Sequence, residues 1–196
     1  MGVLTWRRGA GCLAPLLMAG ISLAAEDAAE SPLGAAHSEY EIKSAMLYNF
    51  TKFVEWPGSA LGEGGGPVVV GVLGDDALAP VLAAALRDKT VHGHPIVVRR
   101  LDSSADAKSC AVLLVGAADR KEIGRIVQSV GRSPVLTIGE LVQFSRLGGV
   151  IAFIRDGNRI RFEINLDAAE RAGLQVSSKL LGLAAVWREN PPQARN

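Results

Sequence analysis

The chain has 196 residues, a length that favours a single domain and leaves little room for two. Its 21 Lys and Arg residues nearly balance its 20 Asp and Glu residues, and the formal charge of +1 gives no support to a nucleic-acid-binding protein. Hydrophobic residues make up 48% and charged residues 21%, which is ordinary for a globular protein and argues against wholesale disorder. The two cysteines, Cys12 and Cys110, are too few for a disulfide scaffold or a cysteine-rich zinc module.

The first 25 residues have the pattern of a secretory signal. Arg7 and Arg8 are their only charges, an apolar segment follows, and Ser22-Leu23-Ala24 supplies small residues at the positions that a signal peptidase reads. Glycines and a proline interrupt the apolar run, so it would make a poor membrane-spanning helix. We therefore predict a signal peptide over residues 1–24, cleaved near Ala24–Ala25, and export of the remaining chain.

A flexible leader and then a first helix are predicted to follow. Residues 25–38 mix Ala, Glu, Ser, Pro and Gly without periodicity, which is typical of a leader, so we place the start of the folded domain at residue 39. The helix should end at Trp56, because a residue that precedes a proline is pushed out of the helical region. Its apolar positions follow helical spacing: Ile42, Ala45, Met46, Phe50 and Phe53.

This helix is rich in aromatic residues. Five of the chain's ten lie within the seventeen positions from Tyr40 to Trp56, and Leu47 and Tyr48 fall off the main apolar stripe. A helix that is apolar on more than one side is either deeply buried or presents a surface to another protein. Both interpretations stay open for this segment.

Strands and helices alternate through the middle of the chain. Apolar runs rich in β-branched residues predict four strands, at residues 67–73, 95–100, 111–115 and 135–138. Helical stripes lie between them, one from Leu78 to Leu86 and one from Ile123 to Val130 with Asp119 as its N-cap, and a helical turn is expected at 140–145. This alternation predicts an α/β single domain, a mostly parallel sheet flanked by helices.

An antiparallel hairpin is predicted next. Val150–Ile154 and Arg159–Ile164 are joined by the turn Asp156-Gly157-Asn158, and the pair is expected to finish one edge of the sheet. The second strand alternates strictly, which turns one set of its side chains to solvent: Arg159, Arg161 and Glu163.

Two short helices and a tail complete the prediction. Asp167 is expected to cap a helix that Gly173 closes, and Ser177 to cap a last helix. The apolar stripe of that last helix is Leu180, Leu183, Ala184 and Trp187. A polar tail occupies residues 189–196, so the domain is bounded at 39–188.

The search for catalytic and metal-binding motifs is negative. No Gly-x-Ser-x-Gly element is present, and the pair His92 and His94 has no third residue at a metal-ligand spacing, so we interpret it as a strand-entry turn. The glycine-rich loop 62–66 lacks the Lys and Ser/Thr of a phosphate-binding loop. Cys110 lies in an apolar run and is expected to be an inert, buried thiol. We therefore expect no enzyme, no cofactor and no metal.

Two long stretches carry a further signal. The first runs from Tyr40 to Pro57 and reads Tyr-Glu-Ile-Lys-Ser-Ala-Met-Leu-Tyr-Asn-Phe-Thr-Lys-Phe-Val-Glu-Trp-Pro. The second begins Gly-Gly-Val-Ile-Ala-Phe at residues 148–153 and continues through 158–165 to 177–181. Together they resemble the signatures of the YfiR family, and the resemblance extends over about residues 39–187.

The resemblance implies regulation in the periplasm. Members of this family inhibit an inner-membrane diguanylate cyclase by binding its periplasmic domain, and an outer-membrane lipoprotein can sequester the inhibitor, which raises cyclic di-GMP and biofilm formation. Better-known members are dimeric and carry disulfide cysteines. This chain departs from them. Cys12 leaves with the predicted signal peptide, so Cys110 has no partner, and the region of the second signature has Ser145 and Ala152 and no cysteine.

Two surfaces are candidates for partner contact, each with three residues: Tyr48, Phe53 and Trp56 on the first helix, and Arg159, Arg161 and Glu163 on the hairpin. The alternative function is a small-molecule sensor or solute-binding protein. Open α/β sheets bind ligands beyond the carboxyl ends of their strands, which here fall near Gly74-Asp75, Gly116 and Gly139.

Overall fold

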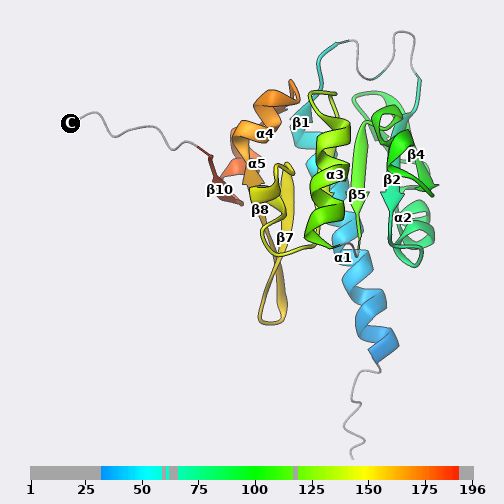
Figure 1. Ribbon diagram of the computed structural model, residues 1–196. Helices are drawn as coiled ribbons and strands as arrows, with labels where there is room; N and C mark the ends of the chain where they lie inside the picture. The colour runs from blue at the N-terminus through cyan, green and yellow to red at the C-terminus, as the bar shows by residue number, and fades with distance from the viewer. Residues whose placement is uncertain (1–31, 59–60, 62–65, 117–118, 190–196) are drawn as a thin grey trace, which may run out of the picture. The chain divides into compact units, whose positions relative to one another are not determined.

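The structure is a computed structural model that describes residues 32–58, 61, 66–116 and 119–189 (Figure 1). The predicted signal peptide, residues 25–31 of the leader and residues 190–196 of the tail lie outside the described residues. The described residues belong to one compact unit.

Within the described residues, the main sheet has eight strands. In spatial order they are β10 (Ala185–Trp187), β8 (Arg159–Asn165), β7 (Ile151–Asp156), β6 (Leu136–Gly139), β5 (Val112–Val115), β2 (Val68–Leu73), β4 (His94–Leu101) and β3 (Thr90–Val91). Five neighbouring pairs are parallel, while β7 with β8 and β3 with β4 are antiparallel. The predicted fold class, an α/β domain with a mostly parallel sheet and an antiparallel hairpin, is confirmed.

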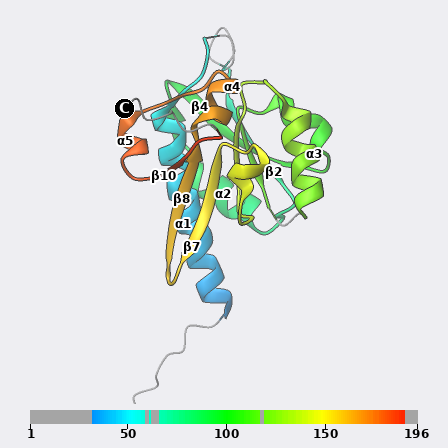
Figure 2. The same cartoon turned by 60° about the vertical axis from the view of Figure 1, so that its left-hand side comes forward.

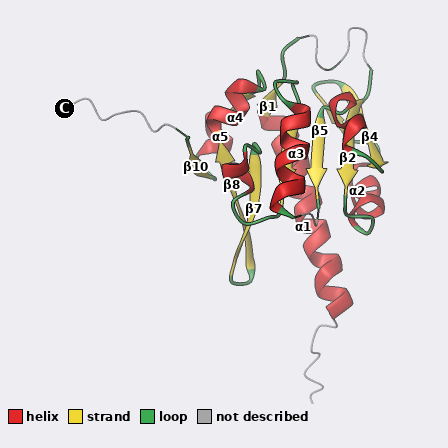
Figure 3. Ribbon diagram, viewed as in Figure 1, coloured by secondary structure: helices red, strands yellow, loops and turns green. Residues whose placement is uncertain are grey.

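Helices cover both faces of this sheet (Figure 3). One face carries α1 (Pro32–Phe53), α2 (Leu78–Leu86), α4 (Leu166–Arg171) and α5 (Ser178–Leu181), and the other carries α3 (Arg120–Val130) with the 3₁₀ helices η1 (Ser104–Ser109) and η2 (Phe144–Leu147). The larger core lies under α1, where the Phe50 ring packs 5.8 Å from that of Phe153 and 4.8 Å from that of Phe162, centroid to centroid.

The bounds of α1 differ from the prediction at both ends. The helix begins at Pro32, inside the segment predicted as a leader, because proline suits the first helical position and Ala35 and Ala36 are strong helix formers. It ends at Phe53, earlier than expected, because Val54–Glu55 leave the helix to form strand β1, which pairs with β9 (Gln175–Val176).

The buried face of α1 also differs from the predicted stripe. Leu47 and Phe50 are buried, but Ile42 is 48% exposed and Ala45 is exposed as well. Lys43 takes a buried position instead, because carboxylates reach its ammonium group there, as described below. A hydrophobicity pattern assigns charged residues to solvent and therefore rotates the helix the wrong way.

The end of the chain was predicted as one helix and is a helix followed by a strand. Ser177 caps α5 as expected, but the helix ends at Leu181 and Leu183 is 76% exposed. Residues 185–187 form β10, which pairs with the outer edge of β8, so the hairpin lies one strand inside the sheet edge. An unpaired strand edge favours the addition of another strand, and this tertiary pairing overrides the helical spacing.

Two N-caps show how local signals succeed and fail. Asp119 caps α3 as predicted, with its Oδ1 accepting a hydrogen bond from the Glu122 N–H at 2.8 Å. The cap of α4 is Asn165 and not Asp167, because the Asn165 Oδ1 accepts from the Ala168 N–H at 2.9 Å. Asp167 lies inside the first turn, where its carboxylate accepts the N–H of Glu189.

A wholly buried phenylalanine fixes the junction between β6 and β7. The Phe144 ring lies against two glycines, so that an added Cβ would stand 2.3 Å from the ring at Gly139 and 2.0 Å from it at Gly149. The helical turn expected at residues 140–145 is accordingly the 3₁₀ helix η2 at Phe144–Leu147, which carries this ring into the core.

Gly149→Ala is expected to lower the free energy of unfolding by about 1–3 kcal/mol, because the new methyl group overpacks the Phe144 ring. The matched control is Gly124→Ala in the middle of α3, where an added Cβ meets nothing within 4 Å; there alanine is expected to raise stability by about 0.5–1 kcal/mol. Urea unfolding followed by circular dichroism measures both, and a neutral Gly149→Ala variant would contradict the packing described here.

Candidate partner-binding surfaces

The aromatic residues predicted to contact a partner are half-buried and also hold α1 to the sheet. The Tyr48 hydroxyl donates to the Thr90 carbonyl oxygen at 3.3 Å, and the Trp56 Nε1–H donates to the Ala111 carbonyl oxygen at 3.1 Å. Phe53 is half-buried against the larger core. These three side chains therefore have structural contacts of their own, and each leaves part of its surface open to solvent.

A hollow of about 320 Å³ lies beside Trp56, at the end of α1. It is lined in part by His92 and His94, whose rings bond to main-chain carbonyls: His92 Nε2 to Val54 at 3.1 Å and His94 Nδ1 to Gly66 at 2.8 Å. His92 and Gly93 make the turn between β3 and β4, which confirms the interpretation of this pair as a strand-entry turn. Among the described residues, no three His, Cys, Asp or Glu side chains are grouped so that they could hold a metal ion.

The outer face of the hairpin carries its charged residues as the alternation predicts. Arg159 and Arg161 are exposed, and the Arg161 Nε–H donates to Asp156 Oδ2 at 2.6 Å. Glu163 is half-buried, because its carboxylate accepts a hydrogen bond from the Ser145 hydroxyl of η2. This face lies on the η2 side of the sheet, opposite α1, so the structure does not bring the two predicted groups into one surface.

A charged cluster around the buried Lys43 links α1 to the sheet, and sequence reasoning missed it. Lys43 is 5% exposed, and its ammonium group lies 2.6 Å from a Glu39 oxygen and 2.7 Å from Glu140 Oε2. Glu140 directly follows β6, and Arg155 near the tip of β7 also pairs with Glu39. Only the Glu39–Lys43 spacing of four residues is visible in the sequence, and alone it indicates an ordinary helix-surface ion pair.

The protonation states in this cluster follow from the ion pairs. Burial alone would lower the pKa of Lys43, but its hydrogen bonds with Glu140 and Glu39 outweigh burial and raise that pKa. The hydrogen bond from Lys43 lowers the pKa of Glu39 against the opposing effect of burial, and Arg155 adds to the lowering. Glu140 Oε1, by contrast, is buried and accepts no hydrogen bond in the described part of the chain.

A groove of about 350 Å³ runs from this cluster along β7, on the η2 side. It is lined by the loop that follows β6, by η2, by β7 and by one residue of β8: Glu140, Leu141, Val142, Gln143, Arg146, Ala152, Phe153, Ile154, Arg155 and Glu163. Two of the strand-end positions considered for a ligand are buried and packed, since the Phe144 ring fills the space beside Gly139 and Asp75 abuts Gly116, whereas Gly74 is exposed. The open space thus begins beyond Glu140.

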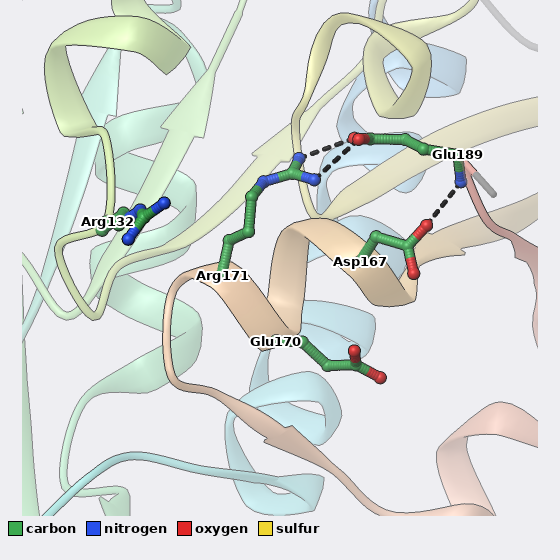
Figure 4. Close-up of a pocket in the computed structure, with 5 residues that line it drawn as sticks. All are labelled: Arg132, Asp167, Glu170, Arg171 and Glu189. Carbon is green, nitrogen blue, oxygen red and sulfur yellow. Dashed lines mark hydrogen bonds and ion pairs between the residues drawn. The ribbon is translucent and has the colours of Figure 1, made fainter.

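A second charged cluster holds the end of the described chain against α4 (Figure 4). Arg171 makes two hydrogen bonds to the Glu189 carboxylate, at 2.7 and 2.6 Å, and the Glu189 N–H donates to Asp167 Oδ2 at 2.6 Å. The Arg171 guanidinium, acting against burial, holds the pKa of Glu189 below its usual value. Because Glu189 follows β10 closely, these bonds fix that strand beside β8.

Fold and surfaces together define the class of protein. It is an α/β domain with an aromatic surface at α1, a charged surface on the hairpin, and a groove at the end of its parallel strands. No helix among the described residues has the length and apolar character needed to cross a membrane. A solved structure of a conserved domain protein from Vibrio cholerae O1 biovar El Tor is similar, with a TM-score of 0.51, 14% identity, and coverage of 76% of this chain and 60% of that one. The structure of the ABC domain in complex with L-Trp from Streptococcus pneumoniae has a TM-score of 0.49 and 11% identity, and the match covers 75% of this chain and 59% of that one.

The family is shown by sequence. The model of the YfiR/HmsC-like family matches residues 40–185, so this chain belongs to that family, as its two signatures predicted. The family is one of periplasmic regulators that pair with diguanylate cyclases. The Vibrio cholerae structure, at 14% identity, supports the fold alone. This chain spans only about three fifths of the length of either solved structure.

Lys43→Met is expected to lower the free energy of unfolding by about 2–4 kcal/mol, because it leaves the Glu39 and Glu140 carboxylates without their shared buried cation. Lys52→Met is the matched control, since Lys52 is exposed in the last turn of the same helix; its effect should be below about 1 kcal/mol. Chemical denaturation compares the two variants, and equal losses would contradict the role assigned to Lys43.

The stability that Glu39 contributes should depend on pH. Its pKa in the folded protein lies below the ordinary value of 4.5, so this contribution is complete above about pH 4.5 and is lost as the pH falls through the lowered value. The difference in unfolding free energy between the wild type and Glu39→Gln should therefore shrink between about pH 6 and pH 3. A difference that stays constant over this range would show that the ion pairs do not stabilise the fold.

Proposed function

We propose that this protein binds the periplasmic domain of an inner-membrane diguanylate cyclase and inhibits it, which lowers cyclic di-GMP. The observation that carries the proposal is the family match over residues 40–185, which spans nearly the whole described domain. The chain is exported with its signal peptide cleaved near Ala24–Ala25, and N-terminal sequencing of the protein from a periplasmic extract tests that step.

Inhibition by binding requires a preference for one state of the cyclase. A ligand shifts a two-state equilibrium only by its difference in affinity for the two states. To move a cyclase from 99% active to 99% inactive, the inhibitor must bind the inactive state about 10⁴-fold more tightly. The inhibitor therefore needs a well-defined contact surface and no chemistry of its own.

The hairpin face is the surface favoured for this contact. Arg159 and Arg161 are exposed, and Glu163 is held in place by Ser145, so the three side chains present a charged face on a paired strand. Tyr48, Phe53 and Trp56 form the second candidate surface, on the opposite side of the sheet. Because those aromatic side chains also stabilise α1, charge changes on the hairpin give the cleaner test. A homodimer and an outer-membrane lipoprotein partner also belong to this proposal.

Arg161→Glu reverses a charge on the hairpin face and is therefore expected to weaken inhibition about tenfold or more. A tenfold loss corresponds to about 1.4 kcal/mol of binding free energy. The assay measures cyclic di-GMP made by the full-length cyclase whose gene lies nearest, as the amount of inhibitor is varied. The matched control is Arg100→Glu, since Arg100 is also an exposed arginine that pairs with an aspartate, Asp76, but lies at the far side of the sheet.

Two results would count against this proposal in different ways. Full inhibition by Arg161→Glu would exclude the hairpin face and leave the aromatic surface as the candidate. Unchanged cyclic di-GMP on deletion of the wild-type gene, with the cyclase present, would contradict inhibition itself. Thermal unfolding of each variant confirms that a lost activity is not a lost fold.

A further inference from the structure

Strand β7 continues beyond the end of the strand beside it. Its pairing with β6 stops at Gly139 and Ala152, whereas its pairing with β8 continues to Asp156 and Arg159. The hairpin therefore projects past the neighbouring parallel strands, next to the first half of α1 (Figures 1 and 2). From Phe153 to Asp156, no strand of the described chain lies on the β6 side of β7.

The register shows which main-chain groups face that side. Asn165 donates its N–H to the Val150 carbonyl, so residues 152, 154 and 156 of β7 also bond toward β8, by the alternation of an antiparallel pair. The intervening residue Arg155 directs its N–H and C=O away from β8. Within the described residues, neither of these two groups has a hydrogen-bond partner. β7 thus offers a free edge for strand addition.

The free edge lies between two hollows, one on each face of the sheet. On the η2 side is the groove of about 350 Å³, with Val142 80% exposed and Ile154 38% exposed. On the α1 side is a hollow of about 90 Å³. It is lined by the charged cluster and by three apolar residues of the hairpin: Glu39, Lys43, Glu140 and Arg155 with Phe153, Ile154 and Ile160. Side chains of an added strand alternate between the two faces. One set would enter the groove, where Val142 and Ile154 expose apolar surface among charged neighbours, and the next set would meet the charged cluster.

One carboxylate oxygen in the charged cluster has no hydrogen-bond donor among the described residues. Glu39 and Lys43 satisfy each other, but Glu140 Oε1 is buried with no hydrogen-bond partner in the part of the chain described. A buried acceptor without a donor costs free energy. A cationic side chain brought in by an added strand would remove that cost if the partly exposed Glu140 carboxylate turned toward it. A second copy of this chain is less suited to this role, because it would add its own β7, whose basic residue Arg155 is already paired with Glu39 of the same chain.

We propose that an extended segment of the partner, with alternating apolar and basic side chains, adds to the free edge of β7 as a new strand. The proposal rests on the proposed function, since it identifies the partner as the periplasmic domain of the cyclase and specifies how that domain is held. The N–H of Arg155 donates to the segment, apolar side chains enter the groove beside Ile154, and a basic side chain bonds to Glu140.

The first test is a peptide-binding measurement on the purified chain. The probe is a fluorescein-labelled Thr-Lys-Val-Lys-Val-Lys-Thr peptide, followed by fluorescence anisotropy. A peptide of the same composition in the order Lys-Lys-Lys-Val-Val-Thr-Thr and a peptide with alternate main-chain nitrogens methylated are the controls. We expect the alternating peptide to bind at least tenfold more tightly than either. Equal binding of the three peptides, or none, would overturn the proposal.

The second test is a pair of variants at one position. Arg155→Thr and Arg155→Pro both lose the guanidinium that pairs with Glu39, but only the proline loses the outward-facing N–H. Proline is tolerated on a strand edge that faces solvent, and circular dichroism checks the fold of both. We expect at least tenfold weaker peptide binding for Arg155→Pro than for Arg155→Thr. If the proline variant does not fold, the methylated peptide on the wild type decides the same question.

The variants also separate this proposal from the proposed function. If the wild type inhibits the cyclase and the two variants inhibit it equally, the edge does not hold the cyclase and only this inference fails. If the wild type inhibits no cyclase, the proposed function fails, whereas peptide binding is still measured independently. Sedimentation tests whether the edge instead binds a second copy of this chain. If Arg155→Thr is a dimer and Arg155→Pro is a monomer, the edge belongs to a second copy and the proposal is overturned.

Discussion

The difference in length between β6 and β7 determines much of this structure. A two-stranded hairpin is marginal by itself, yet β7 and β8 continue past the sheet that supports their first residues. Helix α1 supplies the missing support. Phe50 packs against Phe153 and Phe162 near the base, and Glu39 pairs with Arg155 near the tip. The charged cluster lies where the projecting hairpin meets α1, and the groove lies along the free edge of the same hairpin.

Elements whose causes are local were predictable from the sequence. The parallel strands follow from continuous β-branched runs, and Asp119 caps α3 because its side chain needs only an N–H three residues away. The errors lie where distant residues decide. The rotation of α1 depends on Glu140, about a hundred positions from Lys43, and residues 185–187 become a strand because the edge of β8 is free to pair.

The candidate surfaces also combine features that were predictable from local sequence with features that depend on distant residues. Alternation along β8 correctly predicted that Arg159 and Arg161 face solvent, but it could not show that Glu163 is tied to Ser145. Nor could it show that the aromatic residues lie across the sheet from the hairpin face. That Trp56 bonds to Ala111 is a tertiary fact, and it explains why a cluster of aromatic residues that suggests an interface also serves the fold.

Recognition through a strand edge leaves little trace in a sequence. Catalytic and metal sites require particular side chains at particular spacings, which motif searches detect. A free edge needs only main-chain groups, a neighbouring strand that ends early and a groove beside it, and none of these has a fixed residue type. The informative feature in such a chain is that the β6–β7 pairing is shorter than the β7–β8 pairing. This difference is visible only once the register of both pairings is known.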